Sequence, residues 1–146
     1  MIDLAKFSER LKEYMDERGL NGAALAREVN ANRTSVAEFI RGEHLPSTQN
    51  FLAMLDYFNC SADYILGLSE VPSRTEFLQM PPFGKRLREV IEFFGSSQYR
   101  IEKDLKLSGS IVYNWLFGKS LPSVESLEKL ASYFECSIDF LLGREN

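Results

Sequence analysis

The residue types that carry out metal, redox or covalent chemistry are sparse in this chain. Among its 146 residues are two cysteines, Cys60 and Cys136, and a single histidine, His44. Two distant thiols and one imidazole supply neither a tetrahedral metal site nor a disulfide framework. The sequence also lacks a paired acid and base, a nucleophile with its base, and a phosphate-cradling glycine loop. It therefore predicts a protein that is not an enzyme and that binds no metal or other cofactor.

Hydrogen-bonding side chains gather instead at the starts of two short predicted helices. One start is the stretch Asn32-Arg33-Thr34-Ser35, and the other is Ser108-Gly109-Ser110. Asn and Ser are good N-caps, and the glycines at 42 and 118 are typical helix stops. The fold around these two helix starts determines whether their polar groups can contact another molecule.

Both stretches belong to an internal repeat. A shift of 76 residues pairs residues 7–67 with residues 83–143 without a gap, and 17 of the 61 pairs are identical. The identities gather at turn glycines, at Leu-Pro-Ser and at apolar positions, which are the positions that define a backbone. Two copies make a tandem pair and not a solenoid. We therefore predict a first domain at residues 1–68, a linker at 69–82 and a second domain at 83–146.

Each copy has the pattern of five helices. Apolar residues recur every three or four positions up to Gly19 in the first copy and Gly95 in the second, which predicts an amphipathic first helix. Two short segments follow, then a fourth helix that Ser47 or Ser123 can cap, and a short fifth one. No stretch alternates with period two, so no sheet is expected. The predicted fold class is all-α.

Composition places the chain among soluble globular proteins. Apolar residues make up 45% and charged residues 26%, unlike a disordered chain. Asp3 and Lys6 interrupt the N-terminus where a signal peptide would need an apolar core. We expect an unprocessed cytoplasmic protein with no membrane partner. The net charge of −4 gives no general attraction to nucleic acid, so such binding would depend on local patches.

The second and third segments of the first copy form a compact pattern. Leu25 and Val36 belong to an inward apolar face, Ala26 is small enough for a close helix crossing, and Asn30 tolerates the left-handed backbone of a sharp turn. In this pattern, and in its second copy, the chain resembles the helix-turn-helix domain of the phage repressor and Cro-like family, often called the XRE family. The similarity spans nearly the whole chain.

The resemblance implies two tandem five-helix, lambda-repressor-like DNA-binding domains joined by a short linker. It also implies the function of a sequence-specific regulator that binds double-stranded DNA, most simply a repressor that acts by occupancy. In such a domain the N-terminal residues of the third helix face base edges in the major groove. The implied base-reading residues are Asn32, Arg33, Thr34, Ser35 and Glu38 in the first copy, and Ser108, Gly109, Ser110, Ile111 and Asn114 in the second. The implied phosphate contacts are Gln98, Arg41, His44, Lys119 and Ser120.

Charge limits the affinity expected of each copy. Residues 22–46 hold three cations and three anions, and residues 98–122 hold four cations and two anions. Phosphate neutralisation supplies most sequence-independent affinity, so a single copy should bind DNA weakly. Two tethered copies could compensate as an intramolecular pseudo-dimer, and a homodimer would have the same effect.

A protein-protein interaction or dimerisation module, antitoxin-like, is the alternative function, with one or both copies no longer binding DNA. Glu102 favours it, because the resemblance predicts alanine there. Lys106 stands at a turn position usually held by glycine, which predicts a looser crossing in the second copy. On the third helix of the second copy we expect Trp115 in the core and Tyr113 on the surface.

Overall fold

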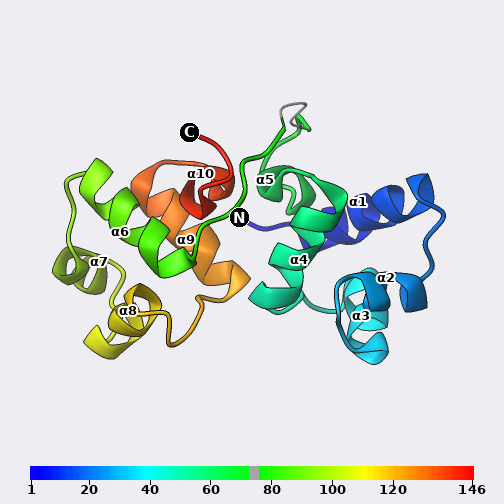
Figure 1. Ribbon diagram of the computed structural model, residues 1–146, viewed down its shortest axis with the longest axis horizontal. Coiled ribbons are helices and arrows are strands. Elements are labelled where there is room, and N and C mark those ends of the chain that lie inside the picture. Colours follow the sequence, from blue (N-terminus) through cyan, green and yellow to red (C-terminus); the bar gives the residue numbers. More distant parts are fainter. Residues whose placement is uncertain (73–75) are drawn as a thin grey trace. The chain divides into compact units, whose positions relative to one another are not determined.

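The computed structural model describes residues 1–72 and 76–146. Ten helices and no strand occur in these two ranges, which confirms the all-α prediction (Figure 1). The chain divides into two compact units, Met1–Phe77 and Leu78–Asn146, whose helical parts we call the first and second domains. The predicted linker at 69–82 includes residues 73–75, which lie outside the described residues. No helix in the described ranges is long and apolar enough to span a membrane.

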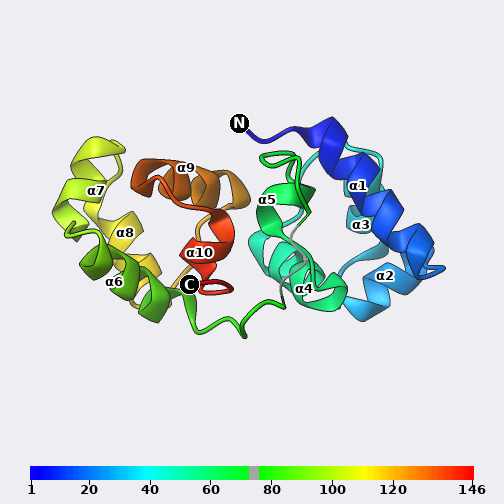
Figure 2. The same cartoon turned by 90° about the horizontal axis from the view of Figure 1, so that it is seen from above.

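The two domains have the same order of long and short helices, as the internal repeat predicts (Figure 2). The helices of the first domain are α1 (Leu4–Glu17), α2 (Gly22–Glu28), α3 (Arg33–Ile40), α4 (Thr48–Phe58) and α5 (Ala62–Ile65). Those of the second domain are α6 (Phe83–Phe93), α7 (Gln98–Asp104), α8 (Gly109–Leu116), α9 (Val124–Phe134) and α10 (Ile138–Leu142). Within each domain the second and third helices pack side by side, as α2 with α3 and α7 with α8.

Side-chain caps begin most of these helices. Ser47 accepts a hydrogen bond from the backbone N–H of Asn50, and Ser123 accepts one from that of Ser126, so the predicted caps of α4 and α9 are confirmed. Such a cap satisfies a backbone donor that has no partner within the helix. Ser108 departs from the prediction: it makes no side-chain cap, and its hydroxyl lies 3.2 Å from that of Ser110 instead.

The turn between the second and third helices is the same in both domains. Asn30 has φ 54° and Lys106 has φ 55°, both in the left-handed region. Asn adopts this conformation readily, whereas Lys does so at a cost. The second domain therefore makes the same turn although Lys106 is unfavourable there. Apolar packing of the helices on both sides of the turn holds this conformation, since Ile101 of α7 and Val112 of α8 are fully buried.

Each domain has its own apolar core, which fixes the third helix. Phe7, Leu11, Val36 and Phe39 are fully buried in the first domain. The third helix of the second domain is held by Trp115, which is only 5% exposed, as expected for a core residue. Because the inward side of each third helix is anchored, its opposite side faces solvent.

Candidate nucleic-acid interface

The start of α3 is open to solvent. Arg33 and Thr34 are exposed and Ser35 is half-buried. Within the described residues the Arg33 side chain makes no hydrogen bond or ion pair. Its planar guanidinium can therefore donate two parallel hydrogen bonds to an outside acceptor pair, such as O6 and N7 of guanine.

Asn32 serves as the cap of α3. Its Oδ1 accepts hydrogen bonds from the backbone N–H of Thr34 at 2.8 Å and of Ser35 at 3.3 Å. A two-point contact with adenine would need this same oxygen as an acceptor. The capped conformation leaves the amide nitrogen, Nδ2, as the group that can donate to an outside acceptor.

Glu38 and His44 contact one another, although the family resemblance implies a base contact for Glu38 and a phosphate contact for His44. His44 Nε2 lies 2.5 Å from Glu38 Oε2, and its Nδ1 lies 3.0 Å from the Leu45 carbonyl oxygen. Both partners are acceptors, so both ring nitrogens must donate and the imidazole is protonated in this arrangement. The hydrogen bond to Glu38, helped by the one to Leu45, raises the pKa of His44 above its ordinary value of 6.5.

Replacing Glu38 with glutamine is expected to bring the pKa of His44 back toward its ordinary value. The pair is present when His44 is protonated. Its contribution to the stability of the folded protein is therefore complete at a pH below the pKa of His44 in the unfolded chain. This contribution is lost as the pH rises through the higher pKa of His44 in the folded protein. An NMR titration measures this directly, since His44 is the only histidine. An unchanged His44 pKa in Glu38→Gln would contradict the contact.

Arg41 is also paired within its own loop. Its guanidinium contacts the Glu43 carboxylate through Nη2 at 3.0 Å, and both side chains are more than half exposed. Such a surface pair is weak, so Arg41 can exchange its partner for a phosphate at low cost.

The start of α8 has a different character. The three residues 108–110 and Ile111 are exposed, and Asn114 is half-buried one turn further on. Lys119 and Ser120 after the helix are exposed too, and their backbone N–H groups donate to the Asn114 carbonyl oxygen. The exposed end of α8 thus offers small polar groups and one apolar side chain, with no arginine comparable to Arg33.

A carboxylate lies beside the start of α8. Gln98 Nε2 donates to Glu102 Oε1 at 2.7 Å, so the side chain expected to reach phosphate is engaged inside the domain. A Cβ added at Gly109 would lie 3.5 Å from Glu102 Oε1, which places the carboxylate against the first residue of α8. Negative charge is favourable at a helix start, but it repels an incoming phosphate.

The first helix of each domain holds the far end of the third helix, which the sequence analysis did not anticipate. Ser8 Oγ donates to the Ile40 carbonyl oxygen at 2.5 Å in the first domain. In the second domain Arg88 Nη2 donates to the Leu116 carbonyl oxygen at 3.1 Å. The Arg88 guanidinium also lies 4.6 Å from the ring centroid of Phe117. The only signal in the sequence is that Ser8 aligns with another small residue, Gly84.

Two exposed aromatic side chains and the side chain of Lys119 lie close together at the end of α8. Tyr113 and Phe117 are 41% and 55% exposed, and their ring centroids lie 4.5 Å apart. Lys119 Nζ lies 5.0 Å from the centroid of Tyr113. The exposure of Tyr113 confirms the expectation from its spacing. The contact with the Tyr113 ring therefore holds the Lys119 ammonium group close to the end of α8.

Comparison with known families decides what the two domains are. A family described as Helix-turn-helix matches the chain twice, at residues 11–65 and 87–141. The chain belongs to this helix-turn-helix family. The two matches contain all of the side chains described above at the starts of α3 and α8 and in the loops after them.

One curated relative adds a functional description. The helix-turn-helix chain is 29% identical over 68 residues to the HTH-type transcriptional regulator ImmR of Bacillus subtilis (strain 168). The aligned region covers 47% of this chain and 54% of that regulator, so the chain spans about half the length of the relative it matches. No solved structure matches the chain.

Proposed function

We propose that this helix-turn-helix protein binds double-stranded DNA and regulates transcription, with the third helix of each domain in a major groove. The observation that carries the proposal is the start of α3, where the exposed Arg33, which has no partner among the described residues, stands on a helix anchored by buried Val36. A rigid helix that presents a bidentate donor suits base recognition. The likeness to a curated transcriptional regulator supports the same function.

The two domains would contribute unequally. In the first, Arg33 and the amide of Asn32 read bases, with Thr34 and Ser35 close by and Glu38 available to cytosine N4 once it separates from His44. In the second, Asn114 and Ile111 are the base-reading side chains, while Ser108 and Ser110 add hydroxyl groups. The phosphate contacts are Arg41 and His44 in the first domain, and Gln98, Lys119 and Ser120 in the second. Repression would follow from occupancy of the operator.

Replacing Arg33 with alanine is expected to weaken binding to the preferred DNA sequence about tenfold and to relax the preference at one base position, as for a lost bidentate contact. The measurement is selection from random duplex pools followed by titration at two salt concentrations. Lys12→Ala is the matched control, because it removes one exposed positive charge from α1 and should leave the base preference intact.

Asn114→Ala reports on the second domain in the same assay. Loss of preference in Arg33→Ala alone would assign base recognition to the first domain. Loss in both variants would assign it to both domains. If the wild type enriched no DNA sequence from the random pools, even at low salt, the proposed function would be wrong.

Replacing Glu102 with glutamine is expected to tighten DNA binding, on the order of two- to tenfold at low salt, with a smaller gain at high salt. Glutamine keeps an acceptor for Gln98 and removes only the negative charge beside the start of α8. Glu28→Gln serves as the control, since it removes one exposed anion from the end of α2. Equal affinity of wild type and Glu102→Gln would mean that α8 does not approach phosphate.

Protein-protein interaction is the second candidate function, and the exposed apolar residues of the second domain favour it. Phe93 is 71% exposed, Tyr99 68% and Phe117 55%, whereas the large exposed apolar residues of the described first domain are Met1 and Val71. Exposed aromatic side chains are enriched at interfaces. A wild-type protein that shows no DNA enrichment but forms a stable complex or dimer would support this function.

A further inference from the structure

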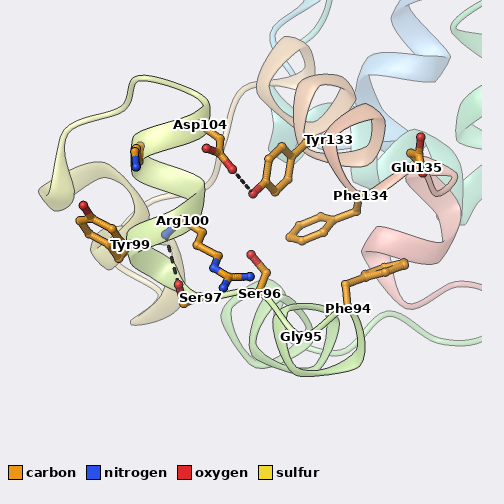
Figure 3. A pocket seen from close by; sticks show the side chains of 11 residues that line it. Phe94, Gly95, Ser96, Ser97, Tyr99, Arg100, Asp104, Tyr133, Phe134 and Glu135 are labelled. Atoms are coloured by element: carbon orange, nitrogen blue, oxygen red, sulfur yellow. Dashed lines mark hydrogen bonds between the residues drawn. The ribbon is translucent and has the colours of Figure 1, made fainter.

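The second domain contains a pocket of about 700 Å³ that the proposed function does not use. The end of α6, one side of α7 and the end of α9 bound it (Figure 3). From α7 it receives Tyr99, Arg100 and Lys103. By helical periodicity these residues lie on the side of α7 opposite to Gln98 and Glu102, which face α8. The pocket is therefore separate from the crossing of α7 and α8.

Flat apolar surfaces form one wall of this pocket. The ring of Phe94 stacks on that of Phe134, with centroids 5.3 Å apart and an angle of 18° between the planes. Tyr133 meets Phe134 edge to face at 5.1 Å. Phe94 remains 39% exposed and Tyr99 68%, so two aromatic rings of the lining are in contact with water. A planar apolar ligand would remove this surface from water and offer stacking partners.

The charged groups of the pocket lining are two cations, Arg100 and Lys103, and two carboxylates, Asp104 and Glu135. Figure 3 shows the Arg100 side chain reaching across the pocket toward Ser96. Within the described residues neither Arg100 nor Lys103 makes an ion pair. The nearby Asp104 is engaged, since Tyr133 Oη donates to its Oδ2 at 2.6 Å. That hydrogen bond raises the pKa of Tyr133, so the phenol keeps its proton and does not compete for the cations.

The first domain has the same framework with different side chains in this region. Arg18 stands at the position of Phe94 and donates to the carbonyl oxygens of the last two residues of α4. Its guanidinium also lies about 5 Å above both of their rings, at 5.2 and 5.1 Å. Ala24 replaces Arg100, so the cation on the second helix is missing. The second domain thus differs from its own copy at the two positions that give the pocket its aromatic wall and its charge.

We propose that this pocket binds a small planar aromatic carboxylate. The ring system lies against the aromatic wall that Phe94 forms with Phe134, and the carboxylate accepts hydrogen bonds from the guanidinium of Arg100. Pockets of a few hundred to about a thousand Å³ with apolar walls and a few convergent polar groups are typical of small-molecule sites. Charge-assisted bonds from a guanidinium to a carboxylate are among the strong ones in proteins, which gives Arg100 the largest single polar role.

The test is a calorimetric titration of the full chain with 1-naphthoate, with acetate and neutral 1-naphthylmethanol as partial analogues. We expect saturable binding of 1-naphthoate, at least about tenfold tighter than of either analogue, since each lacks one half of the recognition. Amide NMR shifts on titration should map to Ser96, Ser97, Tyr99 and Tyr133. Shifts confined to other residues, or equal affinity for acetate or the alcohol, would overturn the proposal.

Variants separate the site from general effects of charge. Arg100→Gln is expected to weaken 1-naphthoate binding about tenfold, whereas Arg27→Gln, which removes an equal charge from α2, should leave it unchanged. Phe94→Arg copies the first domain into the pocket and should abolish binding while keeping the helical circular dichroism spectrum. Binding that survives Phe94→Arg in a folded protein, or no saturable binding by the wild type at millimolar 1-naphthoate, would refute the site. These outcomes do not depend on DNA binding.

Discussion

Replacing Asp139 with alanine is expected to lower the free energy of unfolding of the second domain by about 3 to 5 kcal/mol. Asp139 is 2% exposed and Arg144 is 1% exposed, and Arg144 Nη1 lies 2.5 Å from Asp139 Oδ1. The alanine variant keeps the guanidinium in the interior without its counter-charge. Because a buried, uncompensated charge loses its hydration, removal of one partner costs far more than a surface ion pair is worth.

The loss can be measured by urea denaturation followed through Trp115, the only tryptophan, which lies in the core of the same domain. At the usual stability per residue, a domain of this size is stable by roughly 3 to 10 kcal/mol, so the variant should be marginal or unfolded at ambient temperature. The double variant Asp139→Leu/Arg144→Met is the control. Two apolar residues of similar size can replace a buried pair with little cost, so it should recover most of the stability. A single variant that loses less than about 1 kcal/mol would refute this account.

The buried pair also shows where sequence reasoning stops. The repeat aligns Asp139 with Asp63, but Arg144 lies one residue beyond the repeat and a shift of 76 residues pairs it with Leu68, so nothing in the pattern joins the two members of the pair. The helices themselves were predictable because their signals are local: a cap such as Ser123, a stop such as Gly95, and apolar spacing between them. These signals recur in both copies, so the helices predicted in one copy support those predicted in the other.

The candidate interface was predictable in position but not in its contacts. That Arg33 lies exposed at a helix start follows from periodicity and capping alone. The pairing of Glu38 with His44, and of Gln98 with Glu102, depends on which rotamers meet across a loop or a turn of helix. The family resemblance assigns Glu38, His44 and Gln98 to DNA, whereas the structure gives each of these side chains a partner within the chain. In the proposed function, what these three side chains contribute to DNA binding includes the free-energy cost of separating each from its partner.

Replacing Gly84 with alanine is expected to destabilise the second domain by at least about 2 kcal/mol, although alanine is the better helix former. A Cβ at position 84 of α6 would lie 2.5 Å from the Leu116 carbonyl oxygen and 2.8 Å from that of Trp115. Helix propensity favours alanine by about 1 kcal/mol. The clash outweighs this gain because it is with the backbone at the end of α8, and not with a flexible side chain that could rotate away.

Ser8→Ala in the first domain is the matched comparison for Gly84→Ala. Ser8 occupies the aligned position on α1, and there a Cβ is already accommodated and its hydroxyl donates to the Ile40 carbonyl oxygen. Its replacement removes one hydrogen bond, for an expected cost of about 1 kcal/mol. Gly84→Ala should lower the urea midpoint seen by Trp115, and it should also shift the amide NMR signals along α8, because the helix must move to relieve the contact. If Gly84→Ala proved as stable as the wild type, α6 would not lie this close to α8, and the account of how the first helix of the domain positions the third would have to be abandoned.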